Sequence, residues 1–113
     1  MTELEKEIEK KLRTAVEAVG GLCLKWVCPG WTGVPDRIVL LPGGRLVFVE
    51  TKRPKGGRLS RMQLWWAKVL TVLGFKYEQV WNLKDLELFK FYYLQGGPGT
   101  DEKLGQQDQN TGS

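Results

Sequence analysis

The chain has 113 residues, 42% hydrophobic and 27% charged, a composition typical of one small globular domain. It contains no histidine, which excludes a Ser-His-Asp triad, an HNH-type nuclease site and a histidine-ligated zinc ion. Two cysteines, Cys23 and Cys28, are too few for a structural zinc site, and we interpret them as reduced thiols. Because no apolar run is long enough to cross a membrane and the first residues carry mixed charges, we expect an intracellular protein.

The net charge of +4 is distributed unevenly along the chain. Residues 1–96 carry a net charge of +6, whereas residues 97–113 carry −2 and almost no apolar side chains. We interpret these two parts as a folded domain and a disordered acidic, polar tail. Six basic residues and a single acid lie between positions 45 and 61. This segment indicates either a polyanionic partner or simply a solvated face.

Apolar periodicity and turn residues predict the first half of the fold. An amphipathic helix spans 4–19, and a strand over 22–27 leads into a loop, 28–35, that is rich in glycine and proline. The runs 37–41 and 45–52 flank a Pro-Gly-Gly turn and predict a hairpin. Because the second run is apolar on both faces, we expect it to be a central strand.

The second half of the folded part is predicted to return to helix, strand and helix. Ser60 and Gln63 have the spacing of a capping box that opens a helix over 61–73. A strand over 75–81 and a largely apolar helix over 83–94 follow. The order α-β-β-β-α-β-α predicts an α/β (α+β) fold in which helices flank a mixed four-stranded sheet and the chain ends in a C-terminal helix.

Two carboxylates are predicted to face each other at the open end of the hairpin. If the Pro-Gly-Gly sequence is the loop, Leu41 pairs with Arg45, and the same register places Asp36 opposite Glu50, about 5 Å apart at Cβ. Carboxylates this close repel each other unless a cation joins them, and their oxygens suit a hard divalent ion such as Mg²⁺. Alternatively, Glu50 forms a salt bridge with Lys52 at the edge of the sheet and Asp36 caps a turn.

Lys52 lies two residues after Glu50 in the same strand, so both side chains are expected to point to one face. Beside a metal ion, the lysine would hold or help to deprotonate an attacking water, or offset charge that develops on a phosphate. The backbone carbonyl of Thr51, between the two, is a further candidate metal ligand. These residues predict metal-dependent chemistry on a phosphate, without any histidine.

The same residues resemble a nuclease signature. The chain is similar to the Pro-Asp…(Asp/Glu)-x-Lys nuclease superfamily and, within it, to the virus-type replication-repair nuclease (VRR-NUC) domain, over roughly residues 5–81. The pattern comprises Gly33-Val34-Pro35-Asp36-Arg37, the Pro-Gly-Gly turn, Glu50-Thr51-Lys52 and the Ser60/Gln63 pair. The resemblance implies a restriction-endonuclease-like core and a nuclease that uses Mg²⁺ or Mn²⁺.

The resemblance also implies roles for single residues. Asp36 and Glu50 would bind the metal together with the Thr51 carbonyl, and Lys52 would be the catalytic lysine. Gln63 would be the family's helix glutamine near the site, although its place in the capping box is an equally good explanation.

Related nucleases carry a supporting glutamate on their first helix. Here the candidates are Glu5, Glu7 and Glu9, of which Glu5 fits the spacing best and Glu9, one turn later, is its substitute. Acidic residues in a first helical turn also commonly act only on the helix dipole.

Basic residues after the predicted catalytic strand are candidates for contacts with DNA phosphates. Trp31, in the glycine-flanked loop before Asp36, would either stack on an unpaired base or cover the core. The candidate phosphate-binding residues are Arg37, Arg53, Lys55, Arg58 and Arg61.

Stand-alone members of the family resemble Holliday-junction resolvases, which are homodimers. The resemblance therefore implies an endonuclease that cuts branched DNA, most simply four-way junctions, inside a bacterial or phage-infected cell or at its nucleoid. The aromatic side chains on several faces of the helix 83–94 favour a two-fold interface there. The alternatives are a non-catalytic basic nucleic-acid-binding module, or a nicking or exonucleolytic repair nuclease of the same superfamily.

Overall fold

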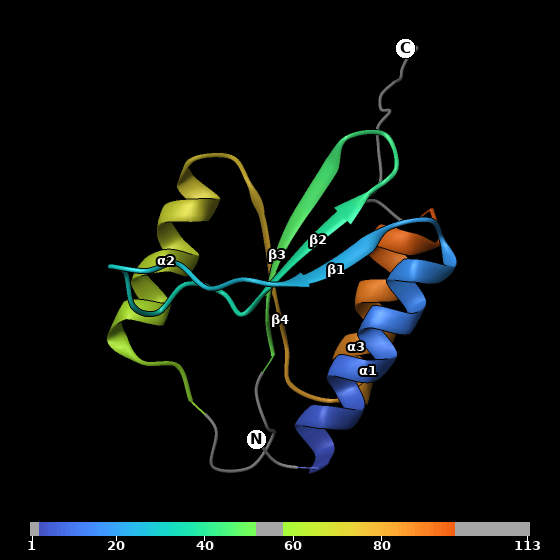
Figure 1. Cartoon of the computed structure of the whole chain (residues 1–113), viewed down its shortest axis with the longest axis horizontal. Helices are drawn as coiled ribbons and strands as arrows, with labels where there is room; N and C mark the ends of the chain where they lie inside the picture. The colour runs from blue at the N-terminus through green and yellow to red at the C-terminus, as the bar shows by residue number, and fades with distance from the viewer. Residues whose placement is uncertain (1–2, 52–57, 97–113) are drawn as a thin grey trace.

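In a computed structural model, which describes residues 3–51 and 58–96, one four-stranded sheet is covered by helices on both faces (Figure 1). β1, β2 and β3 are antiparallel, and β4 lies parallel to β3, in the spatial order β1-β2-β3-β4. The predicted mixed sheet and order of elements are confirmed, and β3 is central. The elements are α1 (Glu3–Ala18), β1 (Leu22–Lys25), β2 (Arg37–Leu41), β3 (Arg45–Thr51), α2 (Arg61–Val72), β4 (Lys76–Val80) and α3 (Leu83–Phe89).

The hairpin between β2 and β3 has the register that the turn residues predict. Leu41 pairs with Arg45 and Arg37 pairs with Val49. Gly43 and Gly44 both adopt positive φ angles, 84° and 75°, which a tight hairpin turn requires and glycine adopts without strain. Continued by one residue beyond β2, this register places Asp36 opposite Glu50.

The core lies on one face of the sheet, where α1 and α3 pack side by side (Figure 1). The buried apolar stripe of α1 recurs at steps of four residues, as in a helix with one face against a sheet. The thiol of Cys23 is buried in this core and is free, and burial raises its pKa. The main core residues are Ile8, Leu12 and Val16 of α1, Val39, Val47, Val49 and Val80 of the sheet, and Leu86 and Phe89 of α3.

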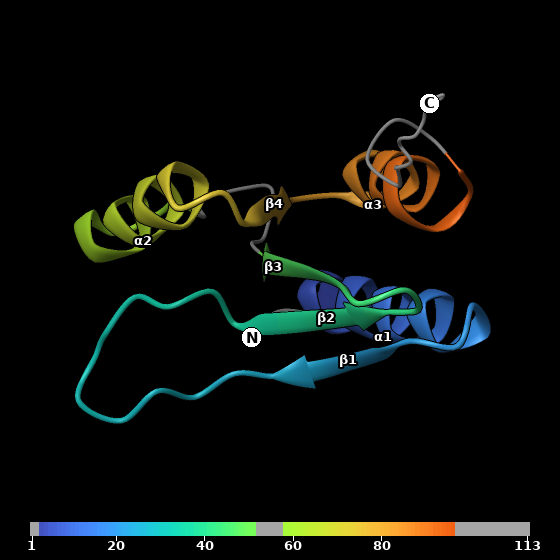
Figure 2. The same cartoon turned by 90° about the horizontal axis from the view of Figure 1, so that it is seen from above.

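The opposite face of the sheet carries α2 and the loop between β1 and β2 (Figure 2). Gly33 lets this loop touch the first turn of α2, because a Cβ at this position would lie 2.6 Å from the Cβ of Met62. Trp66 of α2 donates a hydrogen bond of 3.0 Å from its indole to the Thr32 carbonyl. Thus the loop that precedes Asp36 is attached to the helix that carries Gln63.

The last helix differs from the single α-helix predicted over 83–94. The α-helical part ends at Phe89, and Lys90–Leu94 form one π-helical turn. Within this turn Tyr93 enters the core, its hydroxyl donates to Glu78, and Arg45 donates to its carbonyl at 2.9 Å. These contacts with the sheet explain the wider turn, and they lie too far away in the sequence to be read from local periodicity.

Two segments of interest lie outside the described residues. The predicted tail is 97–113, and the segment 52–57 contains Lys52, Arg53 and Lys55. Among the helices of the described ranges, none is long and apolar enough to span a membrane.

Candidate active site

Asp36 lies against the end of β3. One of its carboxylate oxygens accepts a hydrogen bond of 3.2 Å from the backbone N–H of Thr51, and the other accepts one of 2.8 Å from the Thr51 hydroxyl. Since the Thr51 nitrogen belongs to the peptide group that joins it to Glu50, the Asp36 carboxylate touches the Glu50–Thr51 peptide. Burial raises the pKa of Asp36, although both hydrogen bonds from Thr51 oppose the shift.

The Thr51 hydroxyl also lies 3.0 Å from a carboxylate oxygen of Glu9 in α1. A hydroxyl has one proton to donate, so it cannot donate to Asp36 and Glu9 at the same time. The hydroxyl therefore serves one carboxylate at a time, and Glu9 also accepts a hydrogen bond from the Arg37 guanidinium.

Arg37 forms an ion pair with Glu9. Its guanidinium lies 3.1 Å from the Glu9 carboxylate, and the two side chains are only 13% and 11% exposed. Such a buried pair fixes the position of Glu9 relative to β2. The structure thus places Arg37 in the framework around Asp36, and its predicted contact with a DNA phosphate would require this pair to open.

Glu50 leaves β3 on the opposite face from Thr51, as alternation along a strand requires. It is 4% exposed, and the side-chain amide of Gln63 donates to it at 2.9 Å. The same Gln63 forms the capping box, accepting from the Ser60 N–H at 2.7 Å and donating its own N–H to the Ser60 hydroxyl. Gln63 therefore forms the predicted capping box and also contacts Glu50.

The carboxylate oxygens of this site are the kind of ligand that a hard divalent cation prefers. Asp36 is half-buried and Glu50 is buried, and two carboxylates withdrawn from water at the end of one strand are an arrangement that a cation would stabilise. Asp36 and Glu50 would hold the metal, and Glu9 would support it through Thr51. Within residues 3–51 and 58–96, no three acidic or cysteine side chains gather closely enough to hold an ion by themselves, so substrate oxygens and water would complete the shell.

The first-helix carboxylate of this cluster is Glu9. Glu5, which spacing alone favoured, lies one turn earlier on α1 and is half-buried. The hydrogen bonds to Thr51 and Arg37 are made by Glu9. These contacts favour Glu9, the substitute, as the supporting glutamate.

Comparison with known proteins agrees with this fold. No model of a known protein family matches the sequence. A solved structure described as a VRR_NUC domain is similar to this chain with a TM-score of 0.75 and 29% identity, over 81% of this chain and 100% of its own. The fold is that of a VRR-NUC domain.

A curated protein is also similar to this chain in sequence. It is named "Putative nuclease p44", comes from Acyrthosiphon pisum secondary endosymbiont phage 1, and is 52% identical over 50 residues. The match covers 44% of this chain and 54% of that protein, so it spans about half of the relative's length. The expected resemblance is thereby confirmed.

Two of the predicted DNA contacts can be placed on the VRR-NUC fold. Arg58 is exposed just before α2, and Arg61, also exposed, is the first residue of that helix. Both therefore lie close in sequence to Gln63, which touches Glu50. Lys52, Arg53 and Lys55 lie outside the described residues, and their roles stay predictions.

Trp31 stacks on Trp65, a residue that the sequence patterns did not single out. Its ring is parallel to that of Trp65 in α2, with 7° between the planes and 6.2 Å between the centroids. The sequence did contain a signal: neighbouring helical residues such as Trp65 and Trp66 point about 100° apart, so both cannot face the sheet.

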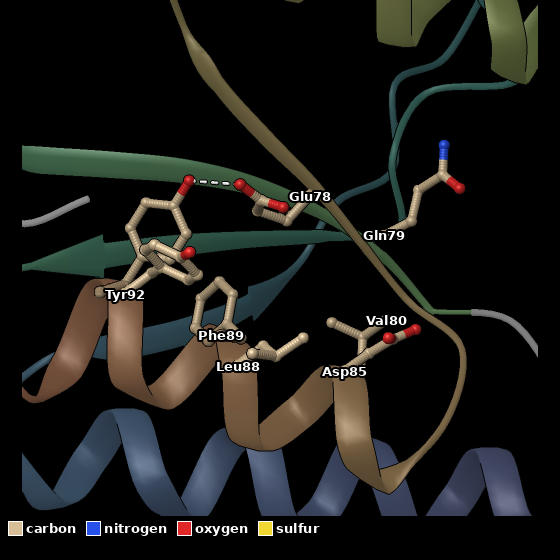
Figure 3. A pocket seen from close by; sticks show the side chains of 8 residues that line it. Glu78, Gln79, Val80, Asp85, Leu88, Phe89 and Tyr92 are labelled. Atoms are coloured by element: carbon tan, nitrogen blue, oxygen red, sulfur yellow. Dashed lines mark hydrogen bonds between the residues drawn. The ribbon is translucent and has the colours of Figure 1, made fainter. Parts of the chain in front are cut away.

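A pocket lies between β4 and α3 (Figure 3). It has a volume of about 240 Å³ and contains the hydrogen bond between Tyr93 and Glu78. Burial is the main reason that the pKa of Tyr93 is raised. The side chain of Gln79, the β4 partner of Glu50, turns away from the other pocket residues in Figure 3. The pocket therefore opens on the core face of the sheet, and Glu50 projects from the other face.

Proposed function

We propose that this protein is a Mg²⁺- or Mn²⁺-dependent endonuclease that cuts branched DNA, most simply four-way junctions. The observation that carries the proposal is that the Asp36 carboxylate accepts from the Thr51 N–H at the end of β3, directly after Glu50, whose carboxylate Gln63 holds. A VRR-NUC fold and a phage relative named as a nuclease support the same chemistry.

In the proposed mechanism, the bound metal would lower the pKa of a water and offset charge on the scissile phosphate. Asp36 and Glu50 would hold the metal, with the Thr51 carbonyl as a further ligand. Gln63 keeps the Glu50 carboxylate in place by its amide hydrogen bond, and Arg37 does the same for Glu9. Lys52 would orient the attacking water or stabilise the phosphate, and Arg53, Lys55, Arg58 and Arg61 would bind neighbouring phosphates.

The proposal includes a homodimer built on the helical segment 83–94. Several of its apolar residues enter the core, but four apolar side chains remain about half exposed. Pairing would bring two identical sites to the two strands that a junction cutter must cleave. Light scattering at micromolar concentration should give a dimer, and a monomer would contradict this part of the proposal. The four side chains are Leu83, Leu88, Phe91 and Tyr92.

The decisive experiment compares cleavage of labelled four-way junction, flap, single-stranded and duplex DNA in Mg²⁺, Mn²⁺ or EDTA. Asp36→Asn, Glu50→Gln and Lys52→Ala should each lower the cleavage rate by at least about 100-fold, because each removes charge at the metal or the phosphate. DNA binding should be nearly unchanged. Glu17→Gln, the same change at an exposed position of α1, is the control and should cut normally.

The outcomes separate the possible functions. Wild-type cleavage that persists in EDTA would rule out the metal mechanism. Binding without cleavage of any substrate would favour a non-catalytic nucleic-acid-binding module. Preferred cutting at strand ends or on one strand only would favour an exonucleolytic or nicking repair enzyme.

A further inference from the structure

Two large aromatic rings lie uncovered on the α2 side of the molecule. Trp31, in the loop between β1 and β2, is 55% exposed, and Trp65, in α2, is 43% exposed. Their rings are parallel within 7° and offset, with 6.2 Å between centroids. Because both rings remain about half exposed, together the two indoles form an aromatic surface, which we call the Trp31–Trp65 platform.

A third indole, that of Trp66, packs against both rings of the platform. Trp66 meets both rings edge-on, at 5.6 Å from Trp31 and 5.2 Å from Trp65. The indole N–H of Trp66 is bonded to the Thr32 carbonyl, and the ring of Trp66 also packs against Trp26 at 6.1 Å. A ligand that stacks on a surface already ordered in this way loses little of its binding free energy to ordering the protein.

The platform is linked to the carboxylate cluster through α2. Trp65 follows Gln63 by two residues, so it lies about 3 Å farther along the helix axis and its side chain points about 200° around the axis from that of Gln63. Gln63 itself donates to Glu50. From Arg61 to Val72, α2 carries Arg61 and Lys68 and no acidic residue. A strand whose phosphate lies at Glu50 would lie next to this positively charged helix, which also carries one of the two open indoles.

We infer that the Trp31–Trp65 platform stacks an unpaired nucleobase of the DNA strand that the Asp36–Glu50 cluster holds. In a duplex, both faces of a base are covered by its neighbours, so only an unpaired or displaced base has a free face for an indole. Stacking of this kind accepts every base, because each has a π face. The inference rests on the proposed function and deepens it, since it makes unpaired nucleotides beside the cut a feature of the substrate.

The test measures binding in EDTA, where no cleavage is needed. The probes are oligothymidylate, a strand of equal length and charge that lacks its bases, and a blunt duplex, each followed by fluorescence anisotropy. Trp31→Leu and Trp65→Leu should each weaken the binding of oligothymidylate about tenfold, and that of the baseless strand and the duplex less than about twofold. Trp65→Phe keeps an aromatic face and should restore most of the affinity.

Leu64→Ala is the matched control, because Leu64 is an exposed apolar residue of the same helix without a π face. Its binding should equal that of the wild type. Equal losses on the thymidylate and baseless strands, or no loss on either, would overturn the inference. So would light scattering in which Trp65→Leu separates a wild-type dimer, because the platform would then be covered by a second copy of the chain.

The two proposals fail in different ways. A wild-type protein that cuts no DNA but binds thymidylate more tightly than the baseless strand, with the expected losses in the variants, supports the platform and contradicts the nuclease. A wild-type protein that cuts DNA but binds the two strands equally contradicts only the platform.

Discussion

The two faces of β3 come from one strand of seven residues but are covered very differently. On one face, Val47 and Val49 are fully buried against α1 and α3. On the other face, Phe48 packs against the rings of Trp26 and Phe75, and Glu50 meets Gln63. The first face supplies the dry core that stabilises the fold, whereas the second keeps open aromatic rings and a buried carboxylate, which cost stability and suit binding.

The largest difference between the two faces should appear in stability. Leu12→Ala removes a fully buried side chain from the core face and should lower the free energy of unfolding by about 2–5 kcal/mol. Leu64→Ala, on the exposed side of α2, should change it by no more than about 0.5 kcal/mol. Urea denaturation followed by circular dichroism measures both. Similar losses in the two variants would contradict the division between a stabilising and an open face.

A second prediction concerns the contact between the β1–β2 loop and α2. Gly33→Ala should destabilise the protein by about 2–3 kcal/mol, because the residue has a φ of 83° and its new Cβ would lie 2.6 Å from the Cβ and 2.7 Å from the backbone carbon of Met62. Gly30→Ala is the control: its φ is 87°, but nothing lies within 4 Å of the new Cβ. It should cost only about 1 kcal/mol.

Gly33→Ala should also move Gln63 away from Glu50 and thus reduce cleavage more than Gly30→Ala does. Equal stabilities of the two alanine variants would mean that the loop can shift away from α2 without loss.

Local signals in the sequence predicted most of the fold and part of the site. The hairpin register followed from the turn, since two glycines between β-rich runs fix which residues pair. The capping box located the start of α2 because Ser60 and Gln63 satisfy each other within one helical turn. The same register, continued by one residue, gives the predicted position of Asp36 opposite Glu50, and their role as metal ligands stays a prediction.

The features that could not be predicted from the sequence depend on tertiary packing between distant segments. Glu5 and Glu9 occupy the same face of α1, so only the way in which the helix packs along the sheet makes Glu9 the neighbour of Thr51. The parallel rings of Trp31 and Trp65 come from segments 34 positions apart, which no periodicity connects. The π turn at Lys90–Leu94 depends equally on distant partners, Arg45 and Glu78.

The third prediction concerns the Asp36 carboxylate, which lies against the end of β3, and its smaller effect on stability. Because burial raises the pKa of Asp36, its charged form destabilises the metal-free fold. Asp36→Asn should therefore raise the melting temperature in EDTA by about 3 °C at neutral pH. The gain should vanish near pH 4, where the unfolded chain also begins to keep the proton, and grow as the pH rises through the raised pKa of the folded state.

The comparison with Asp36→Ala separates charge from hydrogen bonding. Asparagine can still accept from the Thr51 N–H, whereas alanine leaves this donor without its partner and should lower the melting temperature. Added Mg²⁺ should stabilise the wild type and not Asp36→Asn. A stabilisation of Asp36→Asn that does not change with pH would show that the carboxylate charge is not its cause.

The smallest effect compares two tyrosines that lie on opposite faces of the sheet. The Tyr77 hydroxyl is buried on the α2 side and makes no hydrogen bond of normal geometry in the described part of the chain, although the Gln79 side chain is close enough to act on it; burial is the main reason that its pKa rises to about 12. The Tyr93 hydroxyl, on the core side, donates to Glu78. Tyr77→Phe removes an unsatisfied polar group and should stabilise the protein by about 0.5–1 kcal/mol, whereas Tyr93→Phe should destabilise it by about 1–2 kcal/mol. Thermal melts at neutral pH, where both hydroxyls are protonated, measure the difference. If Tyr77→Phe instead lowers stability as much as Tyr93→Phe does, water must satisfy the Tyr77 hydroxyl, and the α2 face would be wetter than its aromatic packing implies.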